Sequence, residues 1–384
     1  MLLVCRQLET AIAAVVLGLS LVYMTRFFAR ATAEQMPEEV QAFAVDPARV
    51  EGHARCVECH AAEVRAWQAS RHAAHAFDVL RSEPSARAYA EELGIRPDEI
   101  ISGSLCLRCH ATPKLDDRGH VSMLAGISCE SCHGGAGGAD GWLNLHAVYG
   151  APGTRREEET SEHYAQRRAA CQRAGQRRSN DLYELAKRCF DCHVVADEAL
   201  AEAGHDHGHN FELATKLFGE VRHNVFLNRS HNADVATLWT DKLRHGAGRT
   251  AAGRKRIVFL VGQLVDLEIS FHRLAQATGD GTFSDLLIER IRGAFDRLTK
   301  DVPEQLVDAE LPEIKQLVTV IKPTVEQLDL RGFTAANRPG YREASAAASA
   351  AARRCAKRDG NRLQALDGLG LISAAPTARV FQPE

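Results

Sequence analysis

Four copies of one short pattern, Cys-x-x-Cys-His, constrain this chain more than any other feature of its sequence. The copies are CVECH (56–60), CLRCH (106–110), CESCH (129–133) and CFDCH (189–193). They hold eight of the 11 cysteines, although histidine makes up only 17 of the 384 residues. A histidine directly after all four cysteine pairs therefore indicates one kind of site that is built four times.

The spacing within each copy fits covalent attachment of haem. In a c-type haem site the two thiols add to the vinyl groups at one edge of the porphyrin, and the next histidine becomes the proximal iron ligand. We therefore predict four covalent haem c groups. The expected thioether residues are Cys56, Cys59, Cys106, Cys109, Cys129, Cys132, Cys189 and Cys192. The expected proximal ligands are His60, His110, His133 and His193.

Other uses of paired cysteines explain the pattern less well. Two CxxC pairs can hold a tetrahedral zinc, but a zinc ribbon does not require histidine after each pair. A thioredoxin-like CxxC belongs to a βαβ context, which the sequence does not show. Disulfides would account for the cysteines and leave the four histidines unexplained.

The N-terminus has the pattern of an export signal. Arg6 precedes an apolar segment, Ala11–Met24, and the small residues Ala31–Ala33 then offer a cleavage site. The apolar segment is shorter than the roughly 20 residues that a membrane span needs. We predict a signal peptide at residues 1–33 and a periplasmic protein, and an uncleaved membrane anchor stays open as the alternative.

The sequences beside the motifs point to a known family. WQASRHAAHA (67–76) follows the first motif, GISCESCHGGAGG (126–138) contains the third, and AGHDHGHNFEL (203–213) follows the fourth. With these neighbours, the segment from about residue 50 to residue 232 resembles the tetrahaem cytochrome c554 family. The resemblance implies an electron carrier whose donor is a hydroxylamine oxidoreductase.

The sixth ligand of each iron decides between a carrier and a catalyst, because a second imidazole closes the iron and an open position lets a small molecule bind. The family pattern implies His72, His146 and His205 as distal ligands, each on a haem other than the nearest in sequence. It also implies that the second haem, on His110, is five-coordinate, although His120 could close it. The remaining candidates are His53, His75, His207, His209, His223 and His231. His205, His207 and His209 could instead form an incidental zinc or nickel site.

We expect a mainly α fold, with short helices and loops wrapped around four haems over residues 34–240. From about residue 250 apolar residues recur at helical spacing, which predicts a helical domain without haem over 250–384. Within it we expect Ser284 to cap one helix, Pro323 to end another and Gly360 to end the last. This domain either buries its own apolar seam or docks a partner.

The polar stretch 155–188 is expected to be a solvated helical excursion. Cys171, within this stretch, lies outside the four motifs and has Cys355 as its candidate disulfide partner.

Together these features predict a periplasmic multihaem cytochrome that passes electrons from one redox protein to another. The formal net charge of −3 gives no indication of nucleic-acid binding. Contact with a membrane is expected only if the N-terminal segment stays uncleaved. One alternative is a haem enzyme acting on a small nitrogen or sulfur compound at an open iron. Others are a membrane-anchored quinol-oxidising tetrahaem protein and a scaffold in which the haems are structural.

Overall fold

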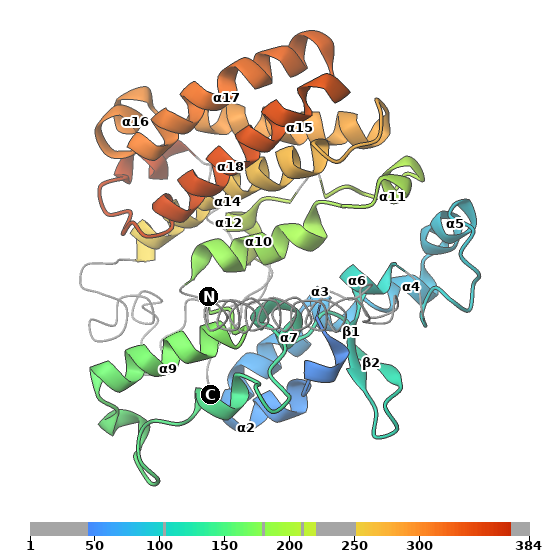
Figure 1. Cartoon of the computed structure of the whole chain (residues 1–384), viewed down its shortest axis with the longest axis vertical. Helices are drawn as coiled ribbons and strands as arrows, with labels where there is room; N and C mark the ends of the chain where they lie inside the picture. The colour runs from blue at the N-terminus through green and yellow to red at the C-terminus, as the bar shows by residue number, and fades with distance from the viewer. Residues whose placement is uncertain (1–44, 103–104, 179–180, 209–210, 220–250, 370–384) are drawn as a thin grey trace, which may run out of the picture. The chain divides into compact units, whose positions relative to one another are not determined.

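A computed structural model of the chain describes residues 45–102, 105–178, 181–208, 211–219 and 251–369, all within one compact unit (Figure 1). The predicted signal peptide at 1–33 and the candidate ligands His209, His223 and His231 lie outside these residues. No helix of the described ranges is long and apolar enough to cross a bilayer.

The prediction of a mainly α fold is confirmed, with a single antiparallel hairpin among the described residues. The helices of the motif-bearing half are α2 (His53–Gln68), α3 (Arg71–Ala74), α4 (Val79–Ser82), α5 (Pro84–Glu92), α6 (Leu107–His110), α7 (Cys129–His133), α8 (Leu143–His146), α9 (Ser161–Arg173), α10 (Leu182–His193), α11 (Glu198–Glu202) and α12 (Leu213–Gly219). The hairpin pairs β1 (Thr112–Leu115) with β2 (Val121–Ala125) between the second and third motifs.

The C-terminal part is built from longer helices: α14 (Ala251–Leu274), α15 (Thr282–Asp296), α16 (Glu304–Glu310), α17 (Pro312–Arg331) and α18 (Arg338–Cys355). Helix α14 contacts α15 and α18, and α18 also contacts α17. The apolar seam predicted from the sequence is buried between these helices, with Leu260, Leu264 and Leu267 fully inaccessible. The helical spacing of the sequence therefore locates the core of this part correctly.

Three of the expected helix limits are wrong. Helix α15 begins at Thr282 with Gly281 as its N-cap, and Ser284 instead sits in the first turn, where its hydroxyl accepts from Gly281 N at 3.0 Å. Helix α18 ends at Cys355, before Gly360. Helix α17 continues through Pro323 to Arg331.

The passage of α17 through a proline has a packing reason. Pro323 is on the exposed side of the helix, so the carbonyl that loses its N–H donor can be hydrated. Ile321, Val325 and Leu328 are buried on the opposite side. Burial of apolar side chains on both sides of the proline stabilises the continuous helix more than the missing hydrogen bond destabilises it.

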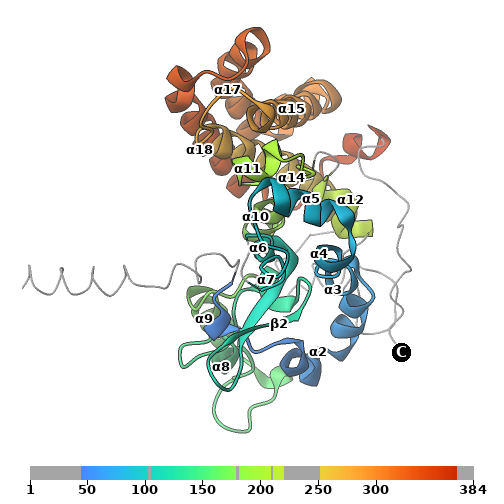
Figure 2. The same ribbon diagram turned by 90° about the vertical axis from the view of Figure 1, so that its right-hand side faces the viewer.

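The stretch 155–188 is less solvated than expected. Tyr164, Arg167 and Cys171 of α9 are buried. Helix α10 buries Leu182, Leu185 and other apolar side chains at helical spacing, and contacts α7 and α14 (Figure 1, Figure 2). The helix that carries the fourth motif thus shares one hydrophobic core with the C-terminal helices.

A leucine pair tests this core. Leu264 on α14 is 0% exposed and Leu330 on α17 is 83% exposed. Leu264→Ala is expected to lower the free energy of unfolding by about 2–5 kcal/mol, because it removes buried methyl groups and leaves a cavity. Leu330→Ala is expected to change it by less than about 0.5 kcal/mol. Denaturant unfolding followed by far-UV circular dichroism compares the two, and equal effects would contradict the described packing.

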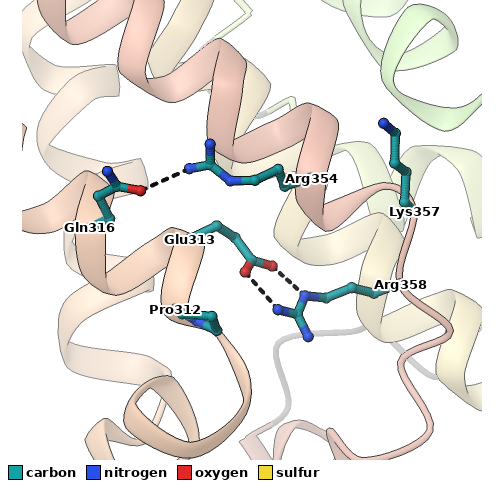
Figure 3. A pocket seen from close by; sticks show the side chains of 6 residues that line it. All are labelled: Pro312, Glu313, Gln316, Arg354, Lys357 and Arg358. Carbon is teal, nitrogen blue, oxygen red and sulfur yellow. Dashed lines mark hydrogen bonds and ion pairs between the residues drawn. The ribbon is translucent and has the colours of Figure 1, made fainter.

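A shallow pocket of about 510 Å³ lies where the start of α17 meets the end of α18 (Figure 3). In it the guanidinium of Arg358 pairs with the carboxylate of Glu313, and Arg354 donates to Gln316 at 3.3 Å. The pocket is lined by Pro312, Glu313, Gln316, Arg354, Lys357 and Arg358. These contacts fasten the two helices together, and the lining holds neither a cysteine nor a histidine.

Candidate haem sites

All four CxxCH motifs share one backbone design. Helices α6, α7 and α10 each end at the motif histidine, and α2 is interrupted at His60, whose angles are non-helical (φ −122°, ψ 41°). Two cysteines three apart on a helix lie on the same face. The end of the helix at the histidine then lets its imidazole leave the helical path and turn toward that face.

The first motif faces a histidine from a distant helix. The rings of His60 and His146, which ends α8, have centroids 6.1 Å apart. His60 Nδ1 points to a carboxylate oxygen of Glu63 at 3.4 Å. The side-chain amide of Gln176 lies 3.0 Å from His146 Nδ1. With its oxygen turned to the ring, that amide would accept the Nδ1 proton and leave Nε2 free for a metal.

The fourth motif faces His72, from the short helix α3. The rings of His72 and His193 have centroids 6.0 Å apart. Phe211 stacks on His193 with centroids 4.1 Å apart and planes at 12°. The backbone of Ile127 donates to His72 O at 2.8 Å, so α3 is fixed to the segment that leads into the third motif.

The second motif faces His205. The rings of His110 and His205 have centroids 6.3 Å apart. His110 Nδ1 lies 2.7 Å from the carbonyl oxygen of Ala76, and His205 Nδ1 lies 2.8 Å from that of Asp206. His120, the alternative for closing this haem, is instead exposed in the β1–β2 turn beside Asp116. The structure therefore places an imidazole opposite His110, where the family pattern implied an open iron, and that imidazole belongs to His205.

These three separations fit haem. A metal–imidazole bond is about 2.0 Å and the ring centroid lies about 1.1 Å behind the nitrogen, so two imidazoles on opposite faces of one iron have centroids about 6.2 Å apart. The observed values are 6.0, 6.1 and 6.3 Å. The sequence expectation named His72, His146 and His205 without assigning each to a haem. The structure brings each of them to a motif histidine, and none of the three pairs joins neighbours in sequence.

The third motif ends in His133, whose Nδ1 lies 2.9 Å from the carbonyl oxygen of Arg177. This bond orients the ring and leaves Nε2 available to a metal. His53, another candidate, packs against Trp67 with ring centroids 4.9 Å apart. His207 lies buried against Phe283, and no cluster of three potential metal ligands occurs in the described ranges, which do not include His209.

Buried polar contacts hold the first and third motifs together. Glu130, inside the third motif, is 1% exposed, and its carboxylate accepts from the backbone of Glu51, Gly52 and Ala136 at 2.7–2.9 Å. The thiols of Cys56 and Cys129 also interact, since Cys129 lowers the pKa of Cys56 and Cys56 raises the pKa of Cys129. The carboxylate of Glu130 therefore links the backbone just before α2 to α7, the helix of the third motif.

The second, third and fourth motifs are also close to one another. The thiol of Cys109 lowers the pKa of Cys192, whereas burial and then the thiol of Cys192 raise the pKa of Cys132. Arg188 of α10 donates to Ser131 O at 2.5 Å. Each motif therefore has at least one thiol that interacts with a thiol of another motif.

The disulfide between Cys171 and Cys355 is contradicted, because both thiols are free. Cys171 Sγ contacts Trp142 O at 3.8 Å, and Cys355 is buried among the C-terminal helices. Each behaves as a small apolar core residue.

The electrostatics around the sites favour neutral imidazole. Burial lowers the pKa of His110 and His133, and it lowers the pKa of His146 to about 4. Because iron binds the unprotonated imidazole nitrogen, these rings are in the ligating state at neutral pH.

Three arginines lie near the motifs, of which Arg273 is buried and Arg177 and Arg178 are partly buried. Burial lowers the pKa of Arg177 and Arg178, and lowers that of Arg273 to about 10. A nitrogen of Arg273, Nη1, is buried without a hydrogen-bond partner. Arg273 Nη2 donates to Asp191 O and Arg178 Nη1 to Gln176 Oε1, so both have neutral acceptors. A cation held out of water without a paired anion is costly, so these arginines suit a bound anion such as a haem propionate. Sequence reasoning missed them, because no local signal distinguishes them among the chain's many basic residues.

Comparison with known proteins supports this assignment for part of the chain. No curated protein and no solved structure matches it. Residues 55–134, which contain the first three motifs, match the family model described as cytochrome c554 and c-prime. The expected resemblance to this family is confirmed over these residues, about a fifth of the chain.

Proposed function

We propose that this protein is an exported tetrahaem c-type cytochrome that carries electrons between two redox proteins. The observation that carries the proposal is the set of three imidazole pairs at haem-ligand spacing, His60–His146, His72–His193 and His110–His205. Two imidazoles close both axial positions of an iron, so the remaining chemistry is the gain and loss of one electron.

The cysteines of each motif would tether a porphyrin, and at the first, second and fourth motifs two imidazoles would orient it. Hydrogen bonds from Nδ1 to Ala76 O, Arg177 O and Asp206 O fix the tautomer of three rings, so that Nε2 would be left to bind the iron. The Glu63 carboxylate beside His60 increases the electron-donating strength of that imidazole. Bound haem iron supplies the ferric–ferrous couple, and two imidazoles favour a lower potential than a Met/His pair.

The thiol contacts support an order for electron passage. The thiols of Cys56 and Cys129 interact between the first and third motifs, and those of Cys109 and Cys192 between the second and fourth. Cys132 of the third motif interacts with Cys192 of the fourth. Each cysteine holds one porphyrin edge, so the proposed order is first, third, fourth, second haem, or the reverse.

The first haem is the proposed point of exchange with a partner. Cys59 is exposed, whereas the other seven motif cysteines are partly buried. Val57, Leu145 and Val148 near this site are also exposed apolar residues. The partner would be a redox protein in the periplasm, and the family resemblance suggests a hydroxylamine oxidoreductase as donor.

Voltammetry of the purified, exported protein on an electrode tests this function. We expect four one-electron couples per chain and no catalytic current when hydroxylamine, nitrite or sulfite is added. A catalytic current with any of these substrates would instead support an enzyme with an open iron. Fewer than four couples would contradict the tetrahaem proposal.

A further inference from the structure

The loop that carries His205 is held by the C-terminal helices. His205 lies between α11 and α12, three residues before Gly208. The carbonyl oxygen of Gly208 accepts a hydrogen bond from Arg290 Nη1, and Arg290 belongs to α15. The neighbouring His207 is 2% exposed and its ring packs edge-on against Phe283, at the start of α15, with centroids 5.7 Å apart.

Arg290 is itself rigidly placed. Its side chain is 3% exposed, and Nε and Nη2 donate to the two carboxylate oxygens of Asp266 at 2.9 and 2.8 Å. Asp266 lies on α14 and also accepts from Ser270 at 3.1 Å. A guanidinium has donors on three nitrogens in one plane, so it can bind a carboxylate with two of them and reach a carbonyl with the third. Lysine carries the same charge but lacks this planar arrangement of donors.

The loop is also pressed against the fourth motif. Gly208 has φ +71°, and a Cβ at this position would lie 2.0 Å from the carbonyl oxygen of His193. The loop therefore cannot move toward α10, and Arg290 prevents its movement away from α15. Glu198 and Glu202 of α11 add contacts to the backbone of Thr278 and Phe283 at 2.9–3.3 Å.

We propose that Arg290 is a positioning residue that keeps the imidazole of His205 opposite His110, so that the C-terminal helices close the second haem. The inference rests on the proposed function, because it takes His205 as an iron ligand. It gives the helical part of the chain a role in the redox centre, where the sequence suggested only a separate core or a docking surface.

The test compares two arginines of the same helix in the full-length protein with its haems. Arg290→Lys keeps the positive charge beside Asp266 and removes the planar set of donors that binds Asp266 and Gly208 together. Arg292→Lys is the control, because Arg292 is 45% exposed and pairs with Asp329 at 2.5 Å on the surface. Carbon monoxide binding to the reduced protein and the high-spin fraction of the oxidised protein report on the iron.

We expect Arg290→Lys to raise the unligated fraction of one haem about tenfold, as the loss of one charge-assisted hydrogen bond predicts. Arg292→Lys should match the unmodified protein. If Arg290→Lys does not fold, the neutral double variant D266N/R290Q removes the same contact without leaving a buried charge. In a His205→Ala background, Arg290→Lys should add no further carbon monoxide binding, because both changes act on one ligand.

Two outcomes separate this inference from the proposed function. If His205→Ala opens a haem and neither Arg290→Lys nor the double variant does, the positioning role is wrong and the carrier proposal stands. If His205→Ala itself changes no haem, His205 is not a ligand and both proposals fail at this site.

Discussion

Replacement of His205 by alanine is expected to convert one low-spin haem into a five-coordinate haem that binds carbon monoxide. The imidazole of His205 lies 6.3 Å, centroid to centroid, from that of His110. Without it the second iron loses its sixth ligand, and the midpoint potential of that haem should rise, since a strong imidazole donor is lost. Optical spectra of the reduced protein with carbon monoxide measure this change, and we expect them to show one additional carbon monoxide-binding haem per chain.

His120→Ala is the matched control for this change. His120 also follows the second motif, but its side chain is 74% exposed in the β1–β2 turn. Its removal should leave the spectra unchanged. New carbon monoxide binding in His120→Ala, with none in His205→Ala, would contradict the described placement of these two residues.

The double variant C189S/C192S is expected to lose the fourth haem and to interrupt electron passage. Serine cannot form the thioethers, so the intact mass should show three haems per chain. Thiols of the fourth motif interact with thiols of both the second and the third, so the second haem should also exchange electrons much more slowly with the others. The variant should unfold more easily, because α10 shares its core with the C-terminal helices.

The control for the cysteine variant is Cys171→Ala. Cys171 is buried and free, but it belongs to no motif. The intact mass should still show four haems, and reduction of all four should proceed at the unmodified rate. Four haems in C189S/C192S would contradict covalent attachment at the fourth motif.

The parts of the site that sequence predicts are those with a fixed local pattern. The motif cysteines and histidines follow from spacing, and His72, His146 and His205 follow from the family pattern. The pairing of these histidines could not be predicted, because each pair joins segments more than 80 residues apart, such as His60 and His146. Only tertiary packing brings them together.

For the fold, too, the sequence predicts some features and not others. Apolar residues at helical spacing locate the C-terminal helices, whereas local stop signals misplace their ends. The sequence predicts that Pro323 ends α17, but burial of Val325 and Leu328 stabilises the helix beyond the proline. Arg290 has no sequence signal at all, since its role depends on Asp266 on one helix and Gly208 on a loop.

Electron paramagnetic resonance of the oxidised, exported protein, with the spins counted against total iron, tests the central claim most directly. That claim is that paired imidazoles close haem irons held by the CxxCH motifs. It predicts four irons per chain, at least three of them low-spin with two imidazole ligands. Fewer than three low-spin irons, or a protein that binds no covalent haem, would contradict it.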